Sequence, residues 1–195
     1  MRIVAGRHRG RRLVAPEGLA VRPTGDRARE ALFDILASGR LTGGQSALAG
    51  AVVLDAFAGS GALGLEALSR GAAHAVFMEN HAPALAALER NVTSLDEGER
   101  AQVLRADVLR PPRPKLPSGA AKAAGCGLAL LDPPYNQGLA GPALVALAAV
   151  GWLAPGALIT VELMAKEPFE APEGFASLDS RKYGKARIEF LRWEG

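Results

Sequence analysis

The stretch Val52-Val53-Leu54-Asp55-Ala56-Phe57-Ala58-Gly59-Ser60-Gly61-Ala62-Leu63-Gly64-Leu65-Glu66 decides the expected fold. It reads as a short buried strand, a glycine-rich turn and the first turns of a helix. Gly59, Gly61 and Gly64 match the pattern Gly-x-Gly-x-x-Gly in the strand–turn–helix context that the pattern requires. Glycine allows a tight turn and lets a ligand approach the backbone closely. The stretch predicts a nucleotide-type cofactor site, although nicotinamide and flavin sites share the same pattern.

From residue 51 onward, short apolar runs alternate with longer helical patterns. Strands are expected at 51–55, 75–79, 101–105, 127–131 and 157–162, and helices at 62–70, 82–94 and 139–150. Such alternation predicts a doubly wound, mostly parallel α/β sheet. The last two strands, 175–182 and 186–193, are joined by three residues, which permits only an antiparallel pair. A seven-stranded sheet that ends in an antiparallel hairpin resembles the class I methyltransferase fold more than half of a dehydrogenase.

The first 40 residues have a different pattern. A β-hairpin is expected over 2–5 and 11–15, followed by a helix for which Asp26 is the expected N-cap. The chain is therefore expected to contain two units, an N-terminal hairpin-and-helix extension at 1–40 and the α/β domain at 51–195.

The positive charge of the chain is concentrated in this extension. The formal net charge is +3 over 195 residues. The first 30 residues hold eight arginines against three acids, a charge of +5, whereas the remainder of the chain is slightly acidic. Arginine suits bidentate phosphate contacts and base stacking, so the block predicts a polyanionic partner, nucleic acid first. A solvated tail without a partner is the alternative. The expected contact residues are Arg7, Arg9, Arg11, Arg12, Arg22 and Arg27.

Acidic residues close to the ends of four expected strands narrow the choice of cofactor. Asp55 would repel a pyrophosphate but can accept a hydrogen bond from an ammonium group; alternatively it only caps the turn. Glu79 is placed to accept both ribose hydroxyls, and Asp107 to meet an adenine amino group. With Asp132, these acids predict a cationic, adenosine-bearing cofactor. The residues expected to bind it are Asp55, Phe57, Gly59, Gly61, Glu79 and Asp107.

The tetrapeptide Asp132-Pro133-Pro134-Tyr135 follows the apolar run 128–131. Two prolines end the strand and fix the backbone path. The Asp132 carboxylate and the Pro133 carbonyl can accept both protons of an exocyclic amine while Tyr135 stacks on the ring. This arrangement would aim the nitrogen lone pair at an electrophilic methyl group, so these three residues are the expected catalytic group. Alternatively, the prolines only end the strand and Tyr135 packs in the core.

The composition and residue spacing argue against several other classes of protein. The single Cys126 rules out an intramolecular disulfide framework and fits a reducing cytoplasm. Neither a transmembrane segment nor a signal peptide is expected. The three histidines lack metal-ligand spacing, so no metal site is expected.

Several sequence segments, spread over nearly the whole chain, resemble those of one protein family. They are Arg2-Ile3-Val4-Ala5-Gly6 with Arg9-Gly10-Arg11, Arg22-Pro23-Thr24 with Asp26-Arg27-Ala28-Arg29-Glu30, Asp55 to Gly71, and the Asp132 tetrapeptide. They resemble the RsmD-type methyltransferases, which modify the N2 amine of guanine 966 in bacterial 16S ribosomal RNA. The resemblance implies the class I fold, S-adenosylmethionine as methyl donor, a ribosomal RNA target, and an extension that helps to hold RNA. Ribosomal RNA in a small-subunit assembly intermediate is the expected partner, although the residues do not choose between free RNA and a partly assembled subunit.

Three alternatives remain open from the residues alone. A DNA adenine-N6 methyltransferase of the same fold shares the tetrapeptide, but this chain lacks a large target-recognition insert. A nicotinamide-dependent oxidoreductase shares the glycine pattern and Glu79. A non-enzymatic assembly factor would use only the arginines. Residue chemistry alone does not choose guanine over adenine or cytosine.

Overall fold

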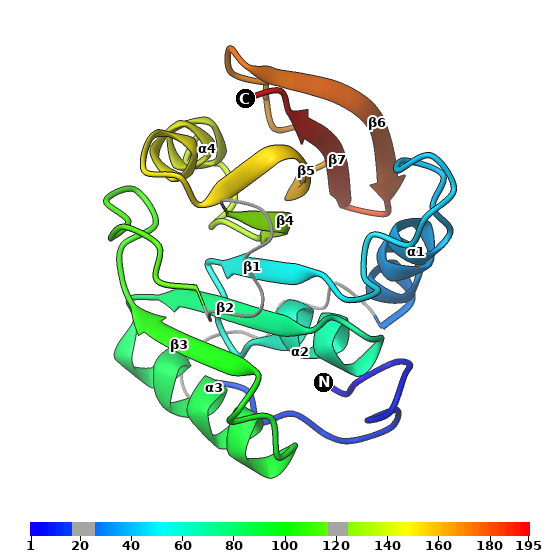
Figure 1. Ribbon diagram of the computed structural model, residues 1–195, viewed down its shortest axis with the longest axis vertical. Coiled ribbons are helices and arrows are strands. Elements are labelled where there is room, and N and C mark those ends of the chain that lie inside the picture. The colour runs from blue at the N-terminus through cyan, green and yellow to red at the C-terminus, as the bar shows by residue number, and fades with distance from the viewer. Residues whose placement is uncertain (17–25, 117–124) are drawn as a thin grey trace.

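The computed structural model describes residues 1–16, 26–116 and 125–195, and its centre is one seven-stranded sheet (Figure 1). The strand order is β3-β2-β1-β4-β5-β7-β6. The strands are β1 (Val52–Ala56), β2 (His74–Glu79), β3 (Ala101–Arg105), β4 (Cys126–Leu131), β5 (Leu153–Met164), β6 (Phe175–Tyr183) and β7 (Ala186–Trp193). β7 pairs antiparallel with both β5 and β6, and the other neighbours are parallel. The predicted mostly parallel sheet with an antiparallel C-terminal hairpin is confirmed.

Helices cover both faces of this sheet. α1 (Asp26–Ala37), α2 (Ala62–Ser69) and α3 (Ala82–Ser94) contribute to one buried apolar cluster, and α4 (Ala140–Ala149) contributes to the other. Alternate residues of β1 show why two cores form, because Val53 joins the first cluster whereas Val52 and Leu54 join the second. Successive side chains of a strand point to opposite faces, so a central strand must be apolar on both.

The expected start of one strand was wrong. β5 begins at Leu153, four residues earlier than expected, because a register shift between Cys126 and Leu128 lets the strand include Pro155 and Gly156. α1 begins at Asp26, where the described residues resume, so its role as N-cap stays a prediction; its carboxylate accepts hydrogen bonds from Arg2 and Arg29.

The N-terminal hairpin is short and rests on the domain. Its strands meet at one antiparallel bridge, between Arg2 and Arg12. The Glu66 carboxylate of α2 accepts hydrogen bonds from the backbone N–H groups of Val4 (2.7 Å) and Ala5 (3.0 Å), and from Arg70 Nε (2.8 Å). Glu66 is fully buried, so these bonds satisfy a charge that would otherwise be costly to bury.

A second contact joins the hairpin to α3. The buried side-chain amide of Asn91 accepts from Val14 N–H at 2.7 Å and donates to Val14 C=O at 3.0 Å and to Ser60 C=O at 2.9 Å. Ser60 belongs to the glycine-rich turn, so one side chain fixes the extension and this turn relative to each other.

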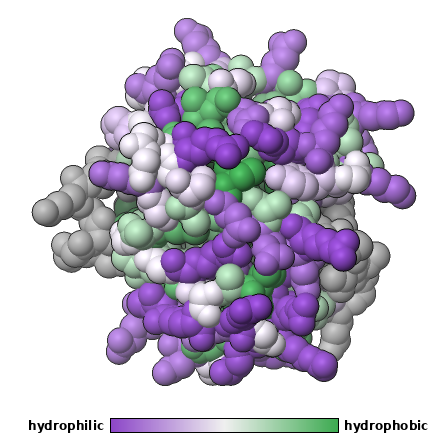
Figure 2. All heavy atoms as spheres, turned by 90° about the vertical axis from the view of Figure 1, so that its right-hand side faces the viewer, coloured by the Kyte–Doolittle hydropathy of each residue, from purple (hydrophilic) through white to green (hydrophobic). Residues whose placement is uncertain are grey.

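The extension also shares the apolar core. Ile3, Leu13 and Phe33 belong to the same buried cluster as strand residues of the domain. The division into units at 1–40 and 51–195 remains a prediction, and it does not coincide with two separate cores. The face that carries α1 exposes mostly hydrophilic side chains, with hydrophobic ones gathered in patches between them (Figure 2).

Removal of the Glu66 charge tests the attachment of the extension. Glu66→Gln leaves one acceptor oxygen and places an NH₂ group against a backbone N–H or the Arg70 guanidinium. We expect the free energy of unfolding to fall by about 2–4 kcal/mol, measured by urea denaturation. Glu89→Gln, at an exposed position on α3, is the matched control. Equal stability of the two variants would contradict this account.

Candidate cofactor and substrate site

A cavity of about 640 Å³ lies at the carboxyl ends of the central strands. We call it the edge cavity. The glycine-rich turn after β1 lines it together with Glu79 at the end of β2, Asp132 and Pro134 after β4, and Glu162 near the end of β5. It is open enough for a ligand of nucleotide size, which agrees with the usual volume of small-molecule sites.

The glycines of the turn have separate physical roles. Gly61 has a φ of +80° and precedes α2, and a Cβ there would lie 2.3 Å from Leu88 Cδ1. A Cβ on Gly64 would lie 2.4 Å from the Phe77 ring, so this glycine allows α2 to pack closely on the sheet. Gly59 has a φ of +56°, and a Cβ there would meet no atom of residues 1–16, 26–116 and 125–195 within 4 Å. The backbone at Gly59 is therefore open to a ligand.

Phe57 also lines the cavity and has a φ of +62°, in the left-handed region that non-glycine residues rarely adopt. Such strain persists only where the surrounding structure enforces it, and it is commonest at ligand sites.

Asp55 lies within β1, one residue before its end, and is almost completely buried. Its Oδ2 accepts from Gly64 N–H at 2.7 Å, which is the turn-capping contact considered as an alternative from the sequence. Burial raises the pKa of Asp55 well above its ordinary value; the Gly64 bond opposes this, and the charges of Asp132 and Glu79 add to it. Because Asp55 also lines the cavity, a nearby cation would favour its charged form.

Glu79 is held tightly at the end of β2. Its Oε2 accepts from Gly59 N–H at 2.8 Å, and its Oε1 accepts from the N–H groups of Asn80 and His81, both at 2.8 Å. The carboxylate therefore has a fixed orientation beside the glycine-rich turn.

Asp107 is placed differently from the other acids. β3 ends at Arg105, and the exposed Asp107 lies two residues beyond it, where its Oδ1 accepts from Leu109 N–H at 2.9 Å. Asp107 is absent from the edge-cavity lining, so its cofactor role remains a prediction.

The Asp132–Tyr135 segment follows β4 directly, and a hydrogen bond from Tyr135 connects it to β5. Asp132 and Pro134 line the cavity, and Pro133 is buried. The half-buried Tyr135 donates its hydroxyl to Glu162 Oε1 at 2.5 Å. This bond sets the tilt of the ring, a constraint that the sequence did not reveal.

Among the described residues, three that line the edge cavity come from the extension and were missed from the sequence. They are Met1, Pro16 and Arg29. Arg29 is buried, and its Nη2 donates to Arg2 C=O at 2.6 Å and to Asp26 Oδ1 at 2.9 Å. The only feature of the sequence that could have indicated a role for Arg29 is its position, since it is a charged residue next to the apolar stripe of the expected helix. Glu162, likewise missed, is the one charged residue in the apolar run 157–163.

The predicted RNA-contacting arginines fall into three groups. Arg7 pairs with the buried Glu97, and Arg11 donates to Ser94 C=O, so both contact the domain itself. Arg9 and Arg27 line a second, separate pocket, and Arg12 is exposed. Arg22 lies outside the described residues. The assignment of all six to RNA remains a prediction.

The described residues give little support for catalysis by a cysteine nucleophile or by a metal ion. Burial raises the pKa of Cys126 to about 12, so the thiol stays protonated and is a poor nucleophile. Within residues 1–16, 26–116 and 125–195, no group of three or more His, Cys, Asp or Glu side chains could hold a metal ion. The same ranges contain no helix long and apolar enough to cross a membrane.

Comparison with known proteins decides the family. The family model described as Conserved hypothetical protein 95 matches residues 1–192. The chain belongs to this family. It is similar to ribosomal RNA small subunit methyltransferase D of Escherichia coli, with 39% identity over 83% of this chain and 74% of the relative. The protein of that name from Haemophilus influenzae is 35% identical over 94% of this chain and 89% of the relative.

Solved structures agree with this membership. The Escherichia coli protein yhhF superposes with a TM-score of 0.78 at 34% identity, covering 100% of this chain and 98% of that one. The 16S rRNA methylase RmtB has a TM-score of 0.58 at 18% identity, covers 85% of this chain and 61% of that one, and shows likeness of fold alone. The class I methyltransferase fold expected from the sequence is thereby confirmed.

Replacement of Asp55 tests the role of its buried charge. In Asp55→Asn, the amide oxygen still accepts from Gly64, and the cost of burying a carboxylate disappears. The pKa of Asp55 is raised in the folded state. The cost of the buried charge therefore grows as the pH rises from the ordinary pKa of an aspartate toward the raised folded value. We expect a higher melting temperature than wild type at about pH 8, and a difference that vanishes near pH 4. A variant less stable than wild type at both pH values would contradict this assignment.

Proposed function

We propose that this protein is an S-adenosylmethionine-dependent methyltransferase that acts on an exocyclic amine of a base in small-subunit ribosomal RNA. One observation carries the proposal: Asp132 and Pro134 line the same cavity as Gly59 and Glu79. The Asp132 carboxylate, which could orient an amine, therefore lines the same cavity as the residues suited to an adenosine-bearing cofactor.

The residues of the edge cavity fit this cofactor. Its lining includes the acids Asp55, Glu79, Asp132 and Glu162, which favours a cationic ligand. The open backbone at Gly59 lets the cofactor lie against the turn, Glu79 would accept the ribose hydroxyls, and Asp55 would face the ammonium group. When bound, the cofactor supplies an electrophilic methyl group on a sulfonium.

The Asp132–Tyr135 segment would hold the acceptor base. The Asp132 carboxylate and the Pro133 carbonyl accept the two amine protons, which turns the nitrogen lone pair out of conjugation with the ring. Tyr135 stacks on the base, and its bond to Glu162 keeps the ring in place. The rate gain then comes from orientation and from fixed negative charge, without a covalent intermediate. A base inside a duplex could not reach this segment, so it must be unpaired or flipped out.

The choice of ribosomal RNA rests on family membership and on the basic extension. Relatives with 35–39% identity carry the name ribosomal RNA small subunit methyltransferase D. We propose N2 of a guanine as the methylated atom, a small-subunit assembly intermediate as the substrate and the cytoplasm as the location, all three from the resemblance described above.

A methyl-transfer assay tests the proposal. Tritiated S-adenosylmethionine is supplied with unmethylated small ribosomal subunits, naked ribosomal RNA or DNA. We expect incorporation into ribosomal RNA, and a loss of about 100-fold or more in kcat for Asp132→Ala, because the fixed acceptor is removed. Glu194→Gln, at an exposed position near the C-terminus, is the control and should keep wild-type activity.

Other outcomes would select a rival function. Incorporation only into DNA would indicate a DNA adenine methyltransferase. Binding of NAD without S-adenosylhomocysteine in calorimetry would indicate an oxidoreductase. Tight RNA binding by wild type without any methyl transfer would indicate an assembly factor.

A further inference from the structure

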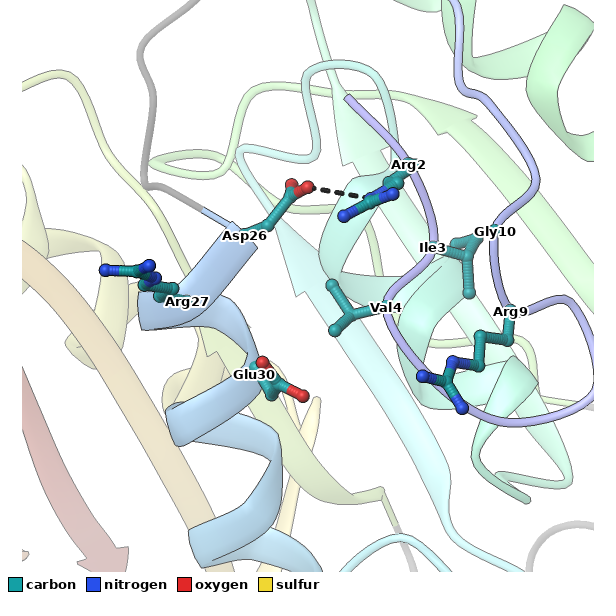
Figure 3. Close-up of a pocket in the computed structure, with 8 residues that line it drawn as sticks. All are labelled: Arg2, Ile3, Val4, Arg9, Gly10, Asp26, Arg27 and Glu30. Atoms are coloured by element: carbon teal, nitrogen blue, oxygen red, sulfur yellow. Dashed lines mark hydrogen bonds and ion pairs between the residues drawn. The ribbon is translucent and has the colours of Figure 1, made fainter.

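A second pocket, of about 340 Å³, lies between the N-terminal hairpin and α1 (Figure 3). We call it the recess. The hairpin contributes Arg2, Ile3, Val4, Arg9 and Gly10, and α1 contributes Asp26, Arg27 and Glu30. Its volume lies near the lower end of the range for small-molecule sites.

The charges of the recess are only partly neutralised. Arg2 pairs with Asp26 at 3.1 Å, and this pair closes one end (Figure 3). Arg9, Arg27 and Glu30 are exposed, and none of them forms an ion pair with any residue of the described ranges. Two guanidinium groups and one carboxylate are therefore available to a ligand.

These groups are arranged around the recess in a way that suits a nucleotide strand. Arg9 extends from the hairpin toward the recess and Glu30 extends from α1 toward the hairpin, whereas the Arg27 side chain points away from the hairpin, on the far side of α1 (Figure 3). Guanidinium groups bind phosphate oxygens well. A carboxylate would repel a bare phosphate, but it accepts hydrogen bonds from a sugar hydroxyl or from the donor edge of a base. The mixture favours a whole nucleotide over an isolated phosphate.

The recess adjoins the edge cavity through a single side chain. Arg29 lines the edge cavity, and its guanidinium donates to Arg2 C=O and to Asp26 Oδ1, both of which belong to recess residues. Arg29 therefore lies between the two cavities, which places the recess next to the edge cavity.

We propose that the recess holds a nucleotide of the substrate RNA close to the target base. Arg9 binds a phosphate in the recess, Glu30 accepts a hydrogen bond from the adjoining sugar or base, and Arg27 binds the next phosphate where the strand passes over α1. Arg7 and Arg11 take no part in this contact, because they are bound to Glu97 and Ser94. The inference rests on the function proposed above and specifies which part of the basic extension reads the RNA.

The test is steady-state methylation of unmethylated small subunits at saturating S-adenosylmethionine. We expect Arg9→Ala and Arg27→Ala each to raise KM for the RNA substrate about tenfold, with kcat within about twofold of wild type. The slope of log KM against log salt should fall by about 1 for each variant, because one phosphate contact is lost. The matched control is Arg90→Ala, which removes an exposed arginine of α3 and should leave KM unchanged.

Glu30 separates a nucleotide site from a simple basic patch. Removal of a carboxylate from a patch that binds only phosphate should tighten RNA binding. If the recess holds a nucleotide, removal of this carboxylate should weaken RNA binding, so Glu30→Gln should raise KM about threefold or more. Replacement of substrate RNA by its 2′-deoxy analogue would abolish the difference between Glu30→Gln and wild type if the sugar is the donor, and preserve it if the base is the donor.

Failure of this inference is distinguishable from failure of the proposed function. If wild type transfers no methyl to RNA, the proposed function is wrong. If wild type is active and Arg9→Ala and Arg27→Ala behave like Arg90→Ala, only the recess is wrong. Calorimetric binding of S-adenosylhomocysteine should be unchanged in all of these variants, which shows that the edge cavity is intact.

Discussion

The position of β1 in the sheet is the constraint on which the site depends. β2 and β3 follow on one side of β1, and β4 and β5 lie on the other, so the strand order reverses there. At such a reversal the connecting chains leave in opposite directions, and a crevice opens at the carboxyl ends of the strands. Glu79 and Asp132, 53 positions apart in the sequence, come to one cavity because their strands flank β1.

The buried polar side chains extend this constraint to the N-terminal extension. Glu66, Asn91 and Glu97 are buried, and each bonds to the extension. Loss of any of these contacts would leave a polar group in the core without its partner. The extension is therefore fixed to the domain, and its Met1, Pro16 and Arg29 form part of the edge-cavity wall. RNA bound by the extension and a cofactor bound in the edge cavity would therefore contact parts of the protein that are bonded to each other.

Much of the fold was predictable from the sequence, because apolar runs of five or six residues between helical patterns fit only a buried parallel sheet. Gly59, Glu79 and Asp132 line one cavity for the same reason, since each ends or closely follows such a run, but their cofactor and catalytic roles stay predictions. Gly61 and Asp107 are absent from that lining; Asp107 lies beyond a turn after Arg105 that local sequence does not reveal. The hairpin partners of Glu66 and Glu97 were also hidden, because each lies more than 60 positions away in sequence. Arg7 and Arg9 show the same limit. Both are arginines of one basic loop, where exposed side chains are expected, and only the fold shows that Arg7 is bound to Glu97.

Mass spectrometry of 16S ribosomal RNA from cells that lack this gene tests the central claim most directly. The account predicts that one methyl group disappears from the exocyclic amine of a base, returns with the wild-type gene and does not return with an Asp132→Ala gene. A methylation pattern identical to that of the parent strain would contradict it.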